Sequence, residues 1–403
     1  MALLPVAEAL ARVIEGAEPL ASETVPLAEA EGRVLADDLV ARRTQPPDDV
    51  SAMDGYAVRA ADVATAPARL RLIGEVAAGR PLAATLRAGE AARIFTGGVL
   101  PPGSDTIVIQ ENTAREDDCV IVKEPAARRK NVRVAGLDFR EGDVALRRGR
   151  RLTGRDVALA AAMNHASLPV TRRPKVAIAA TGDELVPPGT EPKPGQIVYS
   201  NVFALAALAR REGAEVIDLG ILPDRLEETI AGVRRAREAG ADVLLTTGGA
   251  SVGDYDLVQP ALAAEGLALS FWKVALRPGK PLLSGRLGAM RVLGLPGNPV
   301  SAYVCAVLFL LPLIRKLTGR PDVEHALMQG VLGRDLKAND ERQDYLRATL
   351  TRRDDGTLVA TPFPQQDSSM LVPLAAASCL VVRPPHAPAA AAGTPCAFVK
   401  LQD

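Results

Sequence analysis

The middle of the chain alternates strand-like and helix-like segments, and no other feature constrains its fold as strongly. In chain order, the apolar runs typical of strands and the pieces with helical periodicity fall at 175–180, 200–211, 215–221, 224–239 and 242–247. Asp224 and Glu227 form a predicted capping box at the start of the second helix, and Gly240 closes that helix. This order predicts βαβ units with right-handed crossovers on a parallel sheet.

A long apolar segment at 299–317 follows the alternating region. Its most apolar part, from Val300 to Ile314, contains Ser301 and Pro312 and is shorter than the ~20 residues that a membrane span needs. We therefore expect a buried helix and no membrane partner.

The regions on either side of the central domain are rich in short β-like runs bounded by Gly, Pro or Asp. Before it, such runs lie at 70–76, 91–95, 106–110, 119–123 and 144–146. After it, they lie at 345–350, 358–361, 379–382 and 397–401. Helical pieces are expected at 7–14 and from 29 to 36. The fold class is thus α/β plus β: a central parallel-sheet domain, an all-β insertion and a small C-terminal β domain.

Composition excludes several classes of function. Lys plus Arg (48) equals Asp plus Glu (48), and aromatic residues are only 3% of the chain, so the sequence does not indicate nucleic-acid binding. Four cysteines without a CxxC pair and three scattered histidines indicate neither a zinc site nor a disulfide framework. Because Glu8, Glu15 and Glu18 interrupt the N-terminal apolar residues, we expect no signal peptide and a cytoplasmic location.

Three predicted loops meet at the carboxyl ends of the central strands, where open α/β sheets bind ligands. These loops are 181–185, 220–224 and 246–254. The third is rich in glycine and hydroxyl groups, a composition that can place backbone N–H groups against phosphate, although many Gly-rich turns bind nothing. Each loop also carries a carboxylate: Glu184, Asp224 and Asp254. Because such carboxylates would repel a phosphate, the set points to a Mg²⁺–phosphate site, whereas separate helix caps are the simpler interpretation.

Cationic and helix-terminal groups follow the three loops. Arg277 and Lys280 flank a Pro-Gly turn and suit an oxyanion, although either could be a solvated turn residue. The segment 294–301 leads into the apolar helix, whose N-terminus offers N–H donors to an anion.

One rival motif points to a different chemistry. The segment Gly249-Ala-Ser-Val-Gly253 matches the G-x-S-x-G nucleophile elbow of serine hydrolases. Its partners would be Asp256 or Asp340 with His325 or His386, but both histidines lie beyond the predicted α/β domain. The hydrolase hypothesis also leaves the other two loops and the basic turn unexplained.

Six motifs together resemble one known family. They are SAMDGYA (51–57), IFTGG (94–98), TGDE (181–184), TGGASVGD (247–254), RPGKP (277–281) and GLPGNPVS (294–301). In this order they resemble the MoeA family of molybdopterin molybdenumtransferases, which is related to the E domain of gephyrin. The likeness runs from about residue 5 to the end and is loosest in the β tail.

The resemblance implies an architecture and a reaction. The implied domains are a helical, discontinuous linker and dimerisation domain (22–41 and 142–171), a β-rich insertion (42–141), an α/β molybdopterin-binding domain (2–21 and 172–318) and a C-terminal β-barrel-like domain (319–403). It implies a homodimer whose cleft lies between the α/β domain of one subunit and the insertion of the other. The implied reaction uses Mg²⁺, inserts molybdate into adenylylated molybdopterin and cleaves its phosphoanhydride to release AMP.

The resemblance also implies roles for individual residues. Those implied as catalytic are Asp54, Glu184, Asp224 and Asp254, of which the last three are the metal ligands. Those implied to bind the pterin substrate are Thr96, Asp138, Thr181, Gly182, Gly248, Gly249, Ser251, Gly253, Pro296 and Pro299. Those implied to bind molybdate are Arg277, Lys280, Ser301, Arg347 and Ser368, where Ser369 could replace Ser368. Arg277 stands where many relatives have Lys, which keeps the charge but changes the donor geometry.

Other functions agree less well with the sequence. A non-enzymatic, gephyrin-like scaffold would need a fused second α/β domain and a long linker, which this chain lacks. A molybdopterin adenylyltransferase would need the middle domain alone. For the transferase we expect small-molecule substrates, and handover partners among molybdopterin adenylyltransferase and molybdoenzyme maturation proteins.

Overall fold

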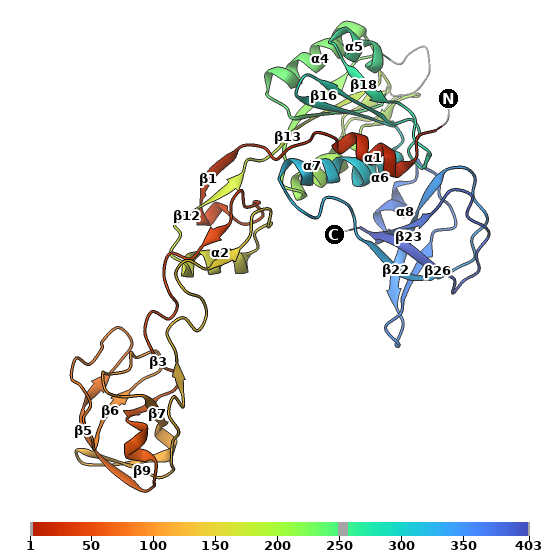
Figure 1. Cartoon of the computed structure of the whole chain (residues 1–403). Helices are drawn as coiled ribbons and strands as arrows, with labels where there is room; N and C mark the ends of the chain where they lie inside the picture. The colour runs from red at the N-terminus through yellow and green to blue at the C-terminus, as the bar shows by residue number, and fades with distance from the viewer. Residues whose placement is uncertain (1–2, 249–256, 402–403) are drawn as a thin grey trace.

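The computed structural model describes residues 3–248 and 257–401, and it is strongly elongated. Figure 1 shows a central α/β domain beside a C-terminal β domain, and a narrow arm that leads to a β domain at the opposite end of the molecule. The arm consists of two chain segments, because the chain runs out to the distal domain and returns.

The central domain has a six-stranded sheet in the order β16-β13-β17-β21-β20-β18. Its strands are β16 (Glu215–Leu222), β13 (Lys175–Thr181), β17 (Val243–Thr247), β21 (Met290–Leu295), β20 (Leu283–Leu287) and β18 (Ala268–Phe271). Strands β16, β13, β17 and β21 run parallel to one another, whereas β20 pairs antiparallel with both of its neighbours, β21 and β18. The helices are α1 (Val6–Ile14), α3 (Asn201–Arg211), α4 (Leu226–Glu238), α5 (Val258–Ala264), α6 (Pro299–Cys305) and α7 (Leu311–Leu317). The predicted βαβ domain is therefore confirmed.

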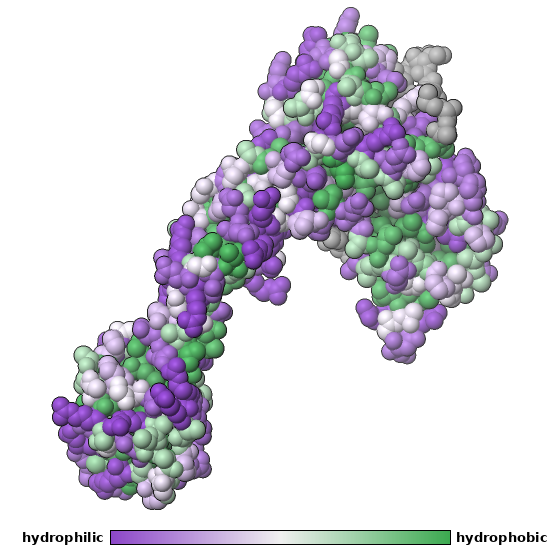
Figure 2. Space-filling view, viewed as in Figure 1, coloured by the Kyte–Doolittle hydropathy of each residue, from purple (hydrophilic) through white to green (hydrophobic). Residues whose placement is uncertain are grey.

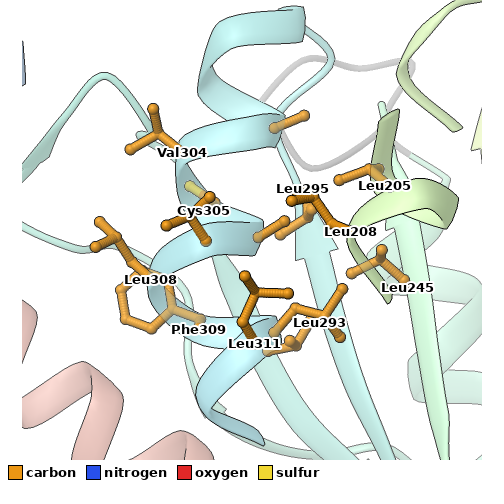
Figure 3. Close-up of a cluster of buried hydrophobic side chains, with 14 of the residues drawn as sticks. Leu205, Leu208, Leu245, Leu293, Leu295, Val304, Cys305, Leu308, Phe309 and Leu311 are labelled. Atoms are coloured by element: carbon orange, nitrogen blue, oxygen red, sulfur yellow. The ribbon is translucent and has the colours of Figure 1, made fainter. Parts of the chain in front are cut away.

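Helices cover both faces of this sheet because its strand residues alternate between two apolar cores. Ile178 and Leu245 face the core under α1, α3, α6 and α7, whereas Ala177 and Leu244 face the core under α4 and α5. Figure 3 shows leucines of β17, β21 and α3 packed against α6, Phe309 and α7.

The apolar helix continues from α6 through a π-helical turn (Ala306–Leu310) into α7. Its length and hydropathy would suit a membrane span, the one such case among the described residues. However, 89% of its most apolar stretch is buried inside the protein. The expected buried core helix is confirmed, because an apolar helix that is surrounded by protein is part of the core.

The distal domain has its own six-stranded sheet, in the order β7-β4-β6-β5-β9-β8. Its strands are β4 (Gly55–Val58), β5 (Ala68–Val76), β6 (Glu90–Ile94), β7 (Thr106–Ile109), β8 (Thr113–Glu116) and β9 (Cys119–Val122), with the small pair β3 (Val50–Ser51) and β10 (Val132–Arg133) at its base. Short 3₁₀ turns lie at Ala60–Val63 and Gln110–Asn112. All these strands fall within the expected β-rich insertion.

The arm is less helical than the sequence suggests. It contains one helix, α2 (Gly154–Ala162), and two strand pairs: β1 (Ser22–Pro26) with β12 (Ser167–Thr171), and β2 (Leu39–Val40) with β11 (Val144–Leu146). The prediction of a helix that starts at residue 29 is wrong. A 3₁₀ turn (Leu27–Glu29) ends there, Gly32 has a φ of 74°, and Leu35 bridges to Val170 of the returning chain. Pairing with a distant segment overrides the local helical pattern.

The C-terminal domain is a closed barrel, because β23 pairs with both β24 and β25. Its strands are β22 (Leu327–Leu332), β23 (Gln343–Arg352), β24 (Leu358–Pro362), β25 (Cys379–Arg383) and β26 (Pro395–Lys400), and α8 (Leu371–Ala375) lies beside it. Strand β19 (Leu276–Arg277) leaves the central domain and pairs with β23, which joins the barrel to that domain. Figure 2 shows green, hydrophobic surface over this junction and along the arm.

Candidate active site at the carboxyl edge of the central sheet

A cavity of about 710 Å³ opens where the loops after β13, β16, β17 and β21 meet. This is the edge that the strand order predicts for a ligand. Eight of the predicted site residues line it: Thr181, Gly182, Glu184, Asp224, Gly248, Lys280, Pro296 and Pro299. The small parallel pair β14 (Leu185–Val186) and β15 (Ile197–Val198) forms part of the wall.

Two glycines of the cavity wall lie so close to neighbouring groups that a side chain would not fit there. A Cβ at Gly248, where φ is 89°, would lie 2.5 Å from the carbonyl oxygen of Thr181. A Cβ at Gly182, where φ is 145°, would lie 2.5 Å from a carboxylate oxygen of Glu184. A side chain at Gly248 would push the loop after β17 away from Thr181, whereas one at Gly182 would displace the Glu184 carboxylate, and both backbone conformations favour glycine.

Asp224 is held by a neighbouring loop and does not cap a helix. Helix α4 begins at Leu226, and its N-cap, Arg225, makes no side-chain capping bond, so the predicted capping box is wrong. Instead, the N–H of Asp183 donates to Asp224 (3.3 Å), and the N–H of Asp224 donates to Asp183 (3.1 Å). This reciprocal pair aligns the loops after β13 and β16 and leaves the Asp224 carboxylate on the cavity wall.

Asn201 is a lining residue that sequence reasoning missed. Its amide donates to the hydroxyl of Thr247 (2.9 Å) and to the carbonyl of Gly297 (2.7 Å), and so connects α3 to the loops after β17 and β21. Its place at the first position of α3 was the available signal, because that helix starts at the carboxyl edge of the sheet. Thr181 also lines the cavity, and its buried hydroxyl has no hydrogen-bond partner among the described atoms.

Of the predicted molybdate ligands Lys280, Arg277 and Ser301, only Lys280 lines the cavity. Lys280 lines the cavity and is exposed, whereas the guanidinium of Arg277 forms a bidentate pair with Asp344 (2.8 and 2.5 Å) and contacts Asp340 (3.3 Å). Arg277 therefore connects β19 to the barrel. Ser301 is buried in the first turn of α6 and is not among the residues that line the cavity.

Arg347 holds the loop that carries the two candidate serines. Its side chain is 1% exposed and donates to the carbonyls of Met370 (2.8 Å) and Asp367 (2.9 Å). Ser369 lines the cavity. Ser368 accepts a hydrogen bond from the amide of Asn298 (3.0 Å), and its carbonyl accepts from the N–H at the start of α6. The structure thus places Ser369, and not Ser368, on the cavity wall.

The three predicted residues of the β-rich insertion lie far from this cavity in the same chain (Figure 1). Asp54 precedes β4 and accepts hydrogen bonds from the backbone N–H and the hydroxyl of Thr96, both at 2.8 Å. These two bonds hold the pKa of Asp54 below its usual range. Asp138 lies where the arm meets the insertion, and its N–H donates to the carbonyl of Gln45. The structure therefore brings Asp54 and Thr96 together, although 42 positions separate them.

Five predicted residues lie outside the described part of the chain: Gly249, Ser251, Gly253, Asp254 and Asp256. The nucleophile of the hydrolase hypothesis is among them. Of the histidines proposed as its partners, His325 contacts the carbonyl of Val307 through its Nε2 (2.7 Å), and no histidine is among the described residues that line the cavity.

The cavity has a donor set that suits Mg²⁺. No group of three potential ligands gathers among the described residues, but Glu184 and Asp224 line one cavity and both offer carboxylate oxygens. Mg²⁺ is usually held by one or two carboxylates, with substrate phosphates and water as its other ligands. The residues present therefore fit this ion when it binds together with a phosphorylated substrate.

Family models cover nearly the whole chain in three consecutive matches. Residues 4–164 match the MoeA N-terminal region (domain I and II), and residues 177–316 match a probable molybdopterin binding domain. Residues 329–401 match the MoeA C-terminal region (domain IV).

Individual relatives agree with these matches. A molybdopterin molybdenumtransferase from Nostoc sp. is 40% identical over 82% of this chain and 77% of its own length. One from Haemophilus influenzae is 35% identical over 90% of each chain. The crystal structure of a molybdopterin biosynthesis MoeA protein from Pyrococcus horikoshii covers 99% of this chain and 100% of its own, with 29% identity and a TM-score of 0.86. The chain described here belongs to the MoeA family.

Proposed function

We propose that this chain is a molybdopterin molybdenumtransferase that completes molybdenum cofactor biosynthesis. It would insert molybdate into adenylylated molybdopterin and cleave the adenylyl phosphoanhydride to release AMP. The observation that carries the proposal is the cavity at the carboxyl edge of the sheet: its carboxylates follow the neighbouring strands β16 and β13, whereas Lys280 precedes β20, which lies beyond β17 and β21 in the strand order. That division of charge suits a substrate that combines a metal-bound pyrophosphate with a separate oxyanion.

Glu184 and Asp224 are the proposed Mg²⁺ ligands, joined by Asp254 from the loop after β17. A bound Mg²⁺ supplies charge neutralisation at the phosphoanhydride and favours its attack by water. The reciprocal bonds between Asp183 and Asp224 keep the Asp224 carboxylate oriented before the substrate arrives. The Gly-rich segment 247–253 is the proposed site of the pterin phosphate.

Lys280 and Ser369 are the groups best placed to meet molybdate, because both line the cavity. A dianion is stabilised by an ammonium group, a hydroxyl and the N-terminus of a long helix, and α6 begins beside these residues. Ser301 and Ser368 are proposed to contribute from the first turn of α6 and from the adjacent loop. We assign Arg277 and Arg347 to positioning this pocket, since their guanidinium groups already bind aspartates and loop carbonyls.

We further propose a homodimer with a composite active site. Asp54 and Thr96 belong to the distal β domain and Asp138 to its junction with the arm, so within one subunit all three lie far from the central domain that holds the cavity (Figure 1). A second copy, arranged so that its insertion meets the cavity of the first, would bring them there. The two hydrogen bonds from Thr96 lower the pKa of Asp54 and fix the orientation of its carboxylate for such a role.

The proposed setting is the cytoplasm, with a resident Mg²⁺ site and small molecules as substrates. The four cysteines are free thiols, as a reducing compartment permits. Molybdopterin adenylyltransferase is the proposed source of the substrate, and molybdoenzyme maturation proteins are the proposed recipients of the product.

The test is release of AMP from adenylylated molybdopterin by the purified protein with Mg²⁺, with and without molybdate. We expect AMP release that depends on molybdate, is lost in Asp224→Ala and survives in Ser251→Ala. Molybdate-independent release, or esterase activity that disappears in Ser251→Ala, would favour the serine hydrolase and overturn the proposal.

A further inference from the structure

A second cavity, of about 310 Å³, lies at the opposite edge of the central sheet. It is enclosed by α1, β18, β20, β21 and α7, and it shares no lining residue with the substrate cavity. Along β21, Arg291 lines this cavity, whereas Leu295 pairs with Thr247 at the other edge. Four residues of extended strand separate the two by about 13 Å. The two cavities are therefore distinct sites.

Three arginines line the second cavity: Arg12, Arg286 and Arg291. Arg291 is only 7% exposed and forms the floor, whereas Arg12 and Arg286 are exposed at its rim. Glu15 is the one acidic residue among its described lining residues. Arg12 is paired with Glu8 (2.5 Å), but Arg286 and Arg291 together still outweigh Glu15, so positive charge exceeds negative charge around a hollow that is partly withdrawn from water.

Arg291 at the floor and Arg286 at the rim bind neutral groups and no carboxylate. Arg291 donates to the carbonyl of Val13 (2.9 Å), and Arg286 donates to the carbonyl of Glu15, both at the end of α1. Among the described residues no carboxylate lies within ion-pair distance of either guanidinium. A guanidinium has five N–H donors, so most donors of both residues are left for another acceptor.

The surroundings of Arg291 disfavour an isolated cation. Burial and the nearby charge of Arg286 lower the pKa of Arg291, and only Glu15 acts in the opposite direction. A bound anion would relieve both effects, because it would neutralise two like charges in a region of low dielectric.

Two serine hydroxyls complete the polar lining. Ser284 of β20 is buried, and Ser270 is the extra residue where the register of β18 and β20 shifts between Leu269 and Phe271. Such bulges redirect a side chain, and here the bulged residue lines the cavity. Hydroxyls beside guanidinium groups are the donors that a phosphate oxygen prefers.

We propose that this cavity binds phosphate, either as the free ion or as the phosphate group of a small ester. Its volume is at the lower end for small-molecule sites, which excludes a large ligand. Arg286 and Arg291 supply the charge, and Ser270 and Ser284 orient the oxygens. The apolar side chains of Leu269 and Leu313 would contact the carbon part of an ester.

The test uses the full-length protein and calorimetric titration with inorganic phosphate in a chloride buffer of low ionic strength. Ser270→Asp places a carboxylate inside the cavity without removing any arginine, and Ser270→Asn is its neutral control of equal size. Arg286→Gln removes one cation from the exposed rim. Lys280→Ala weakens anion binding at the substrate cavity only. Glycerol phosphate, titrated in parallel, distinguishes an ester from the free ion.

We expect one saturable phosphate site in the wild type and in Lys280→Ala, and a weakened but still saturable site in Ser270→Asn, which loses the hydroxyl without adding a charge. The affinity should fall at least tenfold in Ser270→Asp and in Arg286→Gln. Tighter binding of glycerol phosphate than of phosphate would identify an ester as the ligand, and the reverse would identify the free ion. Absence of saturable binding, or binding that is lost only in Lys280→Ala, would overturn the proposal.

Discussion

Asp183 and Asp224 stand on neighbouring loops, and each accepts a hydrogen bond from the backbone of the other. We expect Asp183→Ala to raise the Mg²⁺ concentration for half-maximal AMP release about fivefold, because the lost bond no longer fixes the loop of Asp224. The thermal midpoint should change little, since Asp183 is exposed. The measurement is a Mg²⁺ titration of the AMP-release assay.

Asp183→Asn is the matched control for this variant, because it keeps an oxygen acceptor for the N–H of Asp224 and removes only the charge. Near-wild-type Mg²⁺ dependence in Asp183→Asn would identify the hydrogen bond as the cause. Equal losses in the Ala and Asn variants would mean that the charge matters and the positioning role is wrong.

Asp54 owes its low pKa first to the backbone N–H of Thr96 and then to the Thr96 hydroxyl. Thr96→Val should therefore raise the pKa of Asp54 without restoring its usual value, whereas Thr96→Ser should leave it low. Because the folded pKa is depressed, the contribution of this pair to stability is present above the unfolded pKa and is lost as pH falls through the folded pKa. Carboxyl ¹³C NMR titration measures the shift, and an unchanged pKa in Thr96→Val would contradict the hydroxyl's share.

The sequence alone predicted several residues of the cavity but not how they are held. Glu184 and Asp224 follow from their places in loops at the carboxyl edge of the sheet and Lys280 follows from the basic Pro-Gly turn, and all three line the cavity. The capping role of Asp224 was inferred from its sequence neighbours alone. In the structure, Asp224 instead bonds with Asp183, which lies 41 positions away. Likewise, nothing in the local pattern around Arg347 indicates a buried side chain that binds the 365–370 loop.

At the level of elements, the 365–370 loop depends on Arg347 for its position between the barrel and α6. Arg347→Met would leave the carbonyls of Asp367 and Met370 without their donor, so we expect a loss of about 3 kcal/mol in the free energy of unfolding. The free energy of unfolding of Arg347→Lys should lie between those of Arg347→Met and the wild type, because one ammonium group cannot donate to all of the same carbonyls. Urea denaturation measures the loss, and limited proteolysis should cut within 365–370 first. A Met variant within about 0.5 kcal/mol of wild type would contradict this role.

The elements themselves were predictable where local and tertiary preferences agree. The α/β alternation, the buried helix at 299–317 and the β-rich flanks all appear in the structure. The arm was not predictable in the same way, because its strands pair across more than a hundred residues and the turn at Gly32 replaces the expected helix. Strand pairing of this kind depends on a partner that the local sequence does not contain.

At the scale of the whole molecule, the elongated shape separates two groups of predicted site residues. The central domain, which contains the cavity, and the distal β domain, which contains Asp54 and Thr96, lie toward opposite ends of the molecule (Figure 1). The central claim is therefore that one catalytic site is shared by two copies.

Mixed dimers with two different affinity tags test this claim most directly, with molybdate-dependent AMP release as the readout. A dimer of one Asp54→Ala subunit and one Asp224→Ala subunit should keep about half of the wild-type activity, because one of its two sites is intact. A dimer of one wild-type subunit and one subunit with both substitutions should be inactive, since each of its sites has one substitution. The reverse result, with activity only in the second dimer, would show that each subunit works alone and would contradict the account.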